Sequence, residues 1–188
     1  MTTYTLTRKG SVLEVPSFIN FIFSDKRMAI VWLLARVWLG WQWIEAGMHK
    51  ITNPAWTQTG EALKGFWMGA VQIPAEGRPP ISYDWYRTFI QFMLDSNAYV
   101  WFAKIIAVGE IVIGVSLILG IFIGFTAFLA GFMNWNFIMA GSASVNGIFF
   151  ALAVLLVLAW KVAGYLGADY FILPRIADLW TPAPVKNK

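Results

Sequence analysis

The chain has 188 residues, of which 59% are hydrophobic and 13% are charged, and its formal net charge is +4. Soluble domains carry about a quarter charged residues, so the sequence predicts an integral membrane protein with one domain over residues 1–188. The absence of cysteine and the single histidine exclude iron–sulfur clusters, thiolate zinc sites and a bis-histidine haem held within the chain. We therefore expect no metal site. Because the basic residues lie mostly beside apolar segments, we expect lipid rather than nucleic acid as a partner.

The apolar segments divide into one short stretch and four long ones. Residues 15–23 are too short to cross a bilayer, which requires about 20 apolar residues in a helix, so we expect a short helix that lies in the membrane interface. The four segments long enough to cross are approximately residues 28–48, 99–119, 121–140 and 147–165. The sequence therefore predicts an all-α fold, a bundle of four transmembrane helices.

The distribution of Lys and Arg predicts the orientation of this bundle. Eight basic residues lie before the first segment or from residue 161 onward, whereas residues 49–98 contain four. Cytoplasmic segments carry the excess of basic residues. We therefore expect a multi-pass protein of a prokaryotic cytoplasmic membrane, with both termini on the cytoplasmic side.

The stretch between the first two spans, residues 49–98, is the one long extramembrane loop that the sequence predicts. Asn53-Pro54 is typical of a helix start, with Asn as the cap and Pro in the first turn. Apolar residues then recur with helical spacing on either side of the IPAEGRPP break. We expect two amphipathic helices at the outer surface of the bundle. They either pack on the membrane surface or form a lid over a site.

The first span contains an arginine near its middle. Arg36 is about 12 Å into the span at 1.5 Å per residue, in a hydrocarbon core about 30 Å thick. On a helical wheel Gly40, Trp43, Gly47 and Lys50 fall within about 40° of Arg36. Small residues on this stripe allow close helix contact. We therefore expect the stripe to face the bundle interior.

Glu110, in the second span, is the partner that we predict for Arg36. It is about 16 Å from the start of its span, and because the two helices run antiparallel, both charges are expected at similar depth. We predict an Arg36–Glu110 ion pair, which offsets most of the cost of either charge alone. The pair either fixes the helix register or forms a polar site for a quinone headgroup or a proton path.

Other polar residues in or near the spans are weaker candidates. Asn134 and Asn136 point about 160° apart, so at most one of them faces a given site, and such amides commonly hold helices together. Glu45 lies on the side of its helix opposite Arg36 and precedes His49 by one turn. His49 is either a hydrogen-bonding residue at the interface or, with Glu45, a proton-transfer group.

Three spaced motifs resemble the DoxX family. They are Arg36-x3-Gly40-x6-Gly47-x2-Lys50, Gly109-Glu110-x3-Gly114 and GYLGADY at residues 164–170. The TNPAW and MNWNFIMAGSASVNG stretches are similar to the DoxD-like branch, the membrane subunit of thiosulfate:quinone oxidoreductase. This resemblance implies a four-helix membrane protein that passes electrons to quinone, often together with a partner subunit. The small partner domain of the thiosulfate enzyme is absent from this sequence.

Two hypotheses for the function follow. The first is a component of a quinone-linked oxidoreductase, of the thiosulfate:quinone type, in which Arg36, Glu110 and Asn134 provide the polar part of a pocket. Trp43 and Trp135 would form its aromatic wall, and Lys50, His49 and Arg87 would lie near the entrance for an anionic substrate. The second is a non-catalytic subunit of a larger respiratory or photosynthetic membrane complex. A transporter ranks below both, because no inverted repeat is evident.

Overall fold

The computed structural model describes residues 4–6 and 12–180, and it consists mainly of helices. Before the bundle lie a short antiparallel hairpin, β1 (Tyr4–Leu6) and β2 (Val12–Glu14), then α1 (Ser17–Ser24) and the 3-10 turn η1 (Lys26–Met28). The hairpin is an element that the sequence did not predict. The remaining helices are α2 (Ala29–Ile51), α3 (Pro54–Thr57), α4 (Glu61–Val71), α5 (Asp84–Asp95), α6 (Tyr99–Leu119), α7 (Ile123–Met139), α8 (Asn146–Leu158), α9 (Trp160–Ala163) and α10 (Asp169–Trp180).

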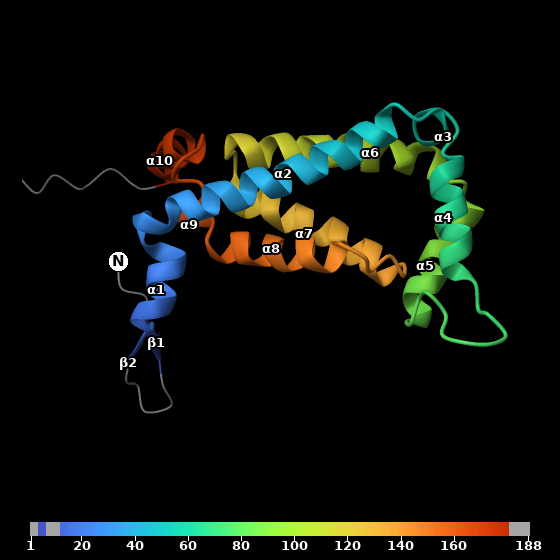
Figure 1. Ribbon diagram of the computed structural model, residues 1–188, viewed down its shortest axis with the longest axis horizontal. Coiled ribbons are helices and arrows are strands. Elements are labelled where there is room, and N and C mark those ends of the chain that lie inside the picture. Colours follow the sequence, from blue (N-terminus) through green and yellow to red (C-terminus); the bar gives the residue numbers. More distant parts are fainter. Residues whose placement is uncertain (1–3, 7–11, 181–188) are drawn as a thin grey trace, which may run out of the picture.

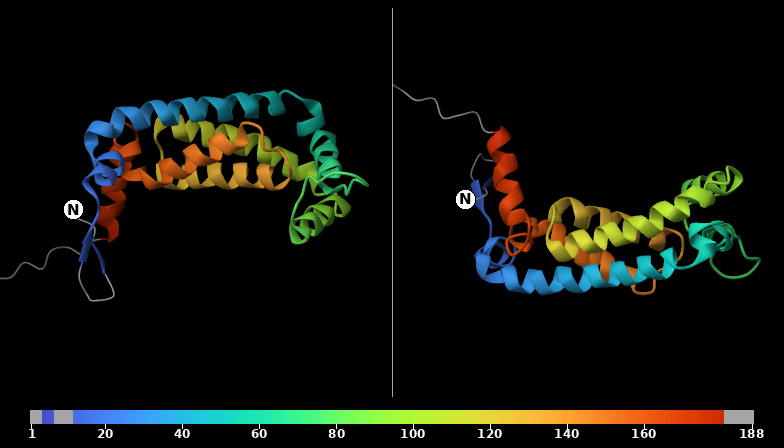
Figure 2. Two further views of the ribbon diagram at one scale, coloured as in Figure 1. Left: turned by 60° about the horizontal axis from the view of Figure 1, so that its bottom comes forward. Right: turned by 90° about the horizontal axis from the view of Figure 1, so that it is seen from above.

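The helices α2, α6, α7 and α8 run alongside one another as a bundle (Figure 1). α1 and α10 lie at one end of this bundle, and α3, α4 and α5 lie at the other (Figures 1 and 2). The predicted amphipathic helices of residues 49–98 are therefore α4 and α5, which pack over the end of the bundle rather than along its side. We refer to their end as the α4–α5 end.

The outer face of the bundle is apolar. α7, for example, exposes Phe125, Phe128 and Phe132 along its length. Large continuous apolar surfaces are rare on soluble monomers and mark contact with lipid or with other proteins. Among the described residues α6, with 21 residues, is long and apolar enough to cross a membrane, whereas α7 and α8 are apolar but have 17 and 13 residues.

Close packing of α2 against α6 fixes the register of the bundle. A Cβ atom added at Gly40 would lie 2.7 Å from the carbonyl oxygen of Gly114, and one added at Gly47 would lie 2.6 Å from the Ile111 side chain. Only glycine at these positions lets the two backbones approach this closely. The register places Gly40 beside Gly114, and Arg36, one turn earlier, beside the carboxyl end of α6.

The opposite end of the bundle, near α10, is closed by a network of hydrogen bonds. The last carbonyl groups of a helix lack partners within the helix, and in α6 those of Leu117 and Ile118 accept hydrogen bonds from Arg36 Nη1, both at 2.6 Å. The Leu119 carbonyl accepts from the Ala168 amide at 3.0 Å. The Asp169 carboxylate accepts hydrogen bonds from the first amides of the α7 turn, at 2.6 and 2.8 Å. Asp169 therefore caps α7 and ties α10 to the α6–α7 turn.

Candidate functional site

A buried ion pair joins α2 and α6 at the α4–α5 end of the bundle. Lys50 Nζ lies 2.8 Å from Glu110 Oε1 and 2.7 Å from Glu110 Oε2. The Glu110 side chain is 1% exposed and that of Lys50 is 18% exposed. The ammonium group also lies 5.2 Å from the centroid of the Trp56 ring on α3. The carboxylate therefore has a charged partner, which a carboxylate buried this deeply requires.

The predicted pairing of Arg36 with Glu110 is wrong, although both residues are buried as expected. Arg36 instead donates hydrogen bonds to the carbonyls of Leu117 and Ile118, and to that of Leu166 at 2.7 Å. Ile118 and Glu110 are eight residues apart on α6, which is about 12 Å of helix, and an arginine side chain cannot extend that far. The predicted depth of each charge is counted from the first residue of its span. The glycine contacts between α2 and α6 instead set the relative depth of the two charges.

The ion pair lies on the wall of a polar cavity of about 300 Å³. Residues of α2, α6, α7 and α8 form this wall, and Trp56 and Phe66 close it from α3 and α4. The polar lining residues are Gln42, Trp43, Lys50, Glu110, Asn134, Ser142 and Asn146. The volume is at the lower end of the range for small-ligand sites, and a few polar groups in an otherwise apolar wall are typical of them.

Two lining residues of the polar cavity have buried polar atoms without a hydrogen-bond partner in the described part of the chain. They are the indole Nε1 of Trp43 and both side-chain polar atoms of Asn134. Asn134 is 0% exposed and Trp43 is 3% exposed. A buried polar group without a partner costs about 1–3 kcal/mol, so folded proteins retain few of them. The cavity wall therefore contains an unused donor and an unused amide next to an ion pair, and both are enclosed by neighbouring side chains.

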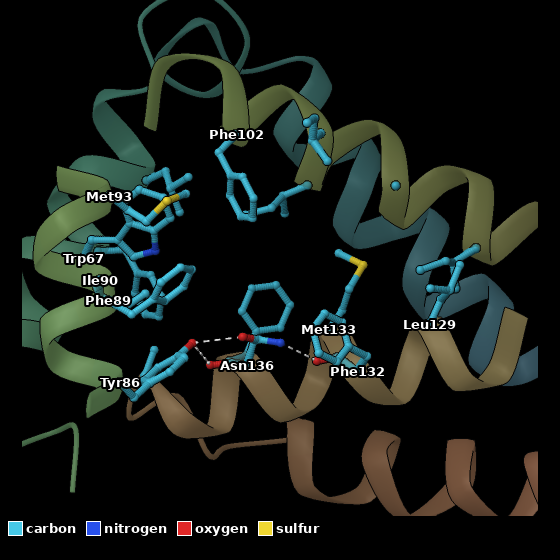
Figure 3. Close-up of a pocket in the computed structure, with 18 of the residues that line it drawn as sticks. Trp67, Tyr86, Phe89, Ile90, Met93, Phe102, Leu129, Phe132, Met133 and Asn136 are labelled. Atoms are coloured by element: carbon cyan, nitrogen blue, oxygen red, sulfur yellow. Dashed lines mark hydrogen bonds between the residues drawn. The ribbon is translucent and has the colours of Figure 1, made fainter. Parts of the chain in front are cut away.

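An apolar pocket of about 380 Å³ (Figure 3) shares lining residues with the polar cavity and lies next to it. It lies between α4, α5, α6 and α7, and Phe66 and Phe137 line both cavities. At its edge the Tyr86 hydroxyl donates a hydrogen bond to the carboxamide or backbone oxygen of Asn136, at 3.2 and 3.1 Å. Burial raises the pKa of Tyr86 to about 12. Its hydroxyl is therefore a neutral donor at physiological pH.

The structure separates the other predicted site residues from these two cavities. Glu45 and His49 lie on the exposed outer face of α2 beside Trp41. Arg87 pairs with Asp84 in its own helix and lines neither cavity. Trp135 also lines neither cavity, because it lies on the outer face of α7, with its ring 6.1 Å from that of Phe132. Of the predicted site residues, the polar cavity brings together Trp43, Lys50, Glu110 and Asn134.

Sequence reasoning missed the apolar pocket and the role of Lys50 as the ion-pair partner. A signal for Lys50 was present, because the helical wheel places it on the same buried stripe as Trp43. For the pocket no comparable signal exists, because its wall comes from four helices whose relative positions depend on tertiary packing.

Comparison with known proteins identifies the family. The DoxX family matches residues 31–143, which is more than half of the chain, and the chain belongs to this family of membrane proteins. The matched region runs from the first turn of α2 to beyond the end of α7 and thus contains most of the lining of both cavities. Neither a curated protein nor a solved structure matches the chain.

Proposed function

We propose that the chain is the membrane component of a quinone-linked oxidoreductase and that its polar cavity binds the quinone headgroup. The observation that carries this proposal is the set of unpaired buried polar atoms of Trp43 and Asn134 in a cavity beside the Lys50–Glu110 ion pair. Membership of a membrane family associated with oxidoreductases supports it. All four bundle helices would cross the membrane, with the α4–α5 end on the outer side and both termini in the cytoplasm.

The residues of the polar cavity fit a quinone headgroup by their chemistry. A quinone presents carbonyl oxygens, which only accept hydrogen bonds, on a flat apolar ring. The Trp43 indole and the Asn134 amide can both donate a hydrogen bond, and neither has a partner among the described residues. Phe66 and Phe137 supply aromatic surface for the ring. When bound, a quinone would supply the capacity to take up two electrons and two protons.

Lys50 and Glu110 are the groups in this cavity that can stabilise charge and move protons. The ammonium group of Lys50 places positive charge at the wall, where negative charge on an acceptor oxygen is stabilised. Glu110 is a carboxylate that can exchange a proton with a group in the cavity. Because Lys50 is partly exposed whereas Glu110 is not, Lys50 lies between the buried carboxylate and the surface.

The electrons have to come from outside the chain in this proposal, since the sequence has no cysteine and a single histidine. The donor would be a partner subunit or a small anionic reductant of the thiosulfate type. Such an anion would approach the α4–α5 end, where Lys50 is the partly exposed cation of the cavity wall.

Quinone binding by the purified protein tests the proposal. A benzoquinone without a side chain, such as 2,3-dimethoxy-5-methylbenzoquinone, would be titrated by calorimetry in detergent. Asn134→Leu and Trp43→Phe each remove an unused polar group, and each is expected to weaken binding about tenfold, as for the loss of one good hydrogen bond. Trp135→Phe is the matched control and should bind as the unaltered chain does. Equal affinity in all four proteins would contradict the proposal.

The second candidate function is a non-catalytic subunit of a larger membrane complex. It is favoured by the exposed Glu45 and His49 on the outer face of α2, beside exposed Trp41 and Met48. A carboxylate facing lipid is costly and is usually paired or covered by protein. Native mass spectrometry after mild extraction distinguishes the candidates. Recovery of the chain only within a large assembly without quinone would favour the subunit.

A further inference from the structure

The apolar pocket and the polar cavity lie side by side along the same two helices. On α6, Gly109 lines the apolar pocket and the next residue, Glu110, lines the polar cavity. On α7, Met133 lines the apolar pocket and the next residue, Asn134, lines the polar cavity. Two phenylalanine side chains, from α4 and α7, line both spaces and form the partition between them. The two spaces are therefore neighbours, and a ligand that fills both would pass between these phenylalanine side chains.

The two spaces differ sharply in chemistry. The wall of the apolar pocket is almost entirely hydrocarbon, with the thioethers of Met93 and Met133 among its lining groups (Figure 3). Two of its polar side chains, Tyr86 and Asn136, already make hydrogen bonds to each other or to the backbone. The Trp67 indole also lines the pocket, but the pocket offers a ligand fewer hydrogen-bonding groups than the polar cavity does. The part of a ligand that fits the pocket is a flexible hydrocarbon.

We propose that the apolar pocket binds the hydrocarbon side chain of the same molecule whose headgroup occupies the polar cavity. This inference rests on the proposed function and extends it, because it names an amphiphilic quinone with a long apolar chain as the ligand. The α4 and α5 helices, which supply Phe66, Trp67, Phe89 and Ile90 to the pocket, cover the chain. The methionine thioethers adapt to a flexible chain, because methionine side chains are unbranched and polarizable.

Gly109 allows the pocket to be filled without disturbing the backbone. A Cβ atom added there would meet its nearest neighbour, Met133 Sδ, at 3.9 Å, which is ordinary van der Waals distance. Gly109→Leu therefore places a side chain in the pocket, and leucine also favours the helix more than glycine does. Gly65→Leu is the matched control, because a Cβ atom at Gly65 meets nothing within 4 Å and Gly65 lines neither cavity.

Binding of two probes tests the inference. The side-chain-free benzoquinone and its decyl derivative would be titrated against the unaltered chain and both variants. We expect the decyl compound to bind about tenfold more tightly to the unaltered chain and to Gly65→Leu. In Gly109→Leu this advantage should fall to about twofold or less, with unchanged affinity for the side-chain-free compound. An advantage that persists in Gly109→Leu would overturn the inference and leave the proposed function intact.

A second variant distinguishes a quinone side chain from a lipid chain that occupies the pocket alone. Ala46 lines the polar cavity from α2, and Ala46→Leu fills it while leaving the apolar pocket unchanged. Loss of binding of both probes in Ala46→Leu supports one ligand that spans both spaces. Retained binding of the decyl compound would overturn the inference, since the pocket would then bind a hydrocarbon chain independently. Failure of both probes to bind the unaltered chain would contradict the proposed function itself.

Discussion

Removal of the Lys50 ammonium group is the most direct test of the buried ion pair. Lys50→Met keeps the length and most of the apolar stem of the side chain but leaves the Glu110 carboxylate, 1% exposed, without its partner. Breaking a buried ion pair costs about 3–5 kcal/mol. The protein can instead protonate the carboxyl group, and at pH 7 this costs about 3.7 kcal/mol for an ordinary glutamic acid. Since Lys50 is 18% exposed, we expect a loss of about 3 kcal/mol.

The loss would be measured as the free energy of unfolding in mixed micelles, with sodium dodecyl sulfate as denaturant and circular dichroism as the signal. Lys104→Met is the control, because Lys104 is an exposed lysine on α6, and its removal should change the stability by about 0.5 kcal/mol or less. The double variant Lys50→Met/Glu110→Gln removes the unpaired charge and should be more stable than Lys50→Met alone by about 1–2 kcal/mol. Equal stabilities of Lys50→Met and Lys104→Met would refute this reasoning.

Three further predictions concern the packing of the bundle. Gly114→Val places a Cβ atom 2.6 Å from the α2 backbone and should cost about 3 kcal/mol of stability, whereas Gly65→Val, in open space, serves as the control in the same unfolding assay. Asp169→Ala removes the cap of α7 and should cost about 2 kcal/mol, with Asp169→Asn closer to the unaltered protein; equal losses would argue against the cap. Because the pKa of Tyr86 is raised to about 12, the contribution of its neutral hydroxyl to the free energy of unfolding is present below about pH 10 and is lost as the pH rises to 12. A titration followed by absorbance at 295 nm should show a tyrosine that ionises late, and Tyr86→Phe should remove this step.

Much of the fold could be predicted from the sequence, because long apolar segments and helical spacing are local signals. The predicted segment 99–119 has the bounds of α6, and α2 ends three residues beyond the predicted segment 28–48. The predicted segment 147–165 corresponds to two helices, α8 and α9, which meet at Ala159. That α2, α7 and α8 cross the membrane stays a prediction. The N-terminal hairpin depends on pairing between strands of three residues, which leaves no periodic signal.

The candidate site was predictable only in part, because a helical wheel gives the direction of a side chain but not its partner. The wheel placed Trp43 and Lys50 on the buried stripe of α2, where the structure has them, and it placed Glu45 on the opposite side. It could not choose between two cations for Glu110. That choice depends on the axial register of two helices, because Arg36 and Lys50 are 14 residues apart on α2, about 21 Å of helix. The register is set by glycine contacts between helices that are far apart in the sequence.

The two ends of the bundle satisfy their buried polar groups in different ways, and this difference supports the proposed position of the binding site. At the α10 end, Arg36 supplies donors to the Leu117, Ile118 and Leu166 carbonyls, and Asp169 accepts from the α7 amides, so the end of α6 is closed by the protein itself. Near the α4–α5 end, the polar atoms of Trp43 and Asn134 lack partners among the described residues. At the α10 end Arg36 Nε also lacks a partner among the described residues, but the two other nitrogens of this guanidinium group donate hydrogen bonds, whereas the Asn134 side chain makes none. In the proposed function the unused groups are ligand contacts, and the affinity lost in Asn134→Leu measures how much they contribute.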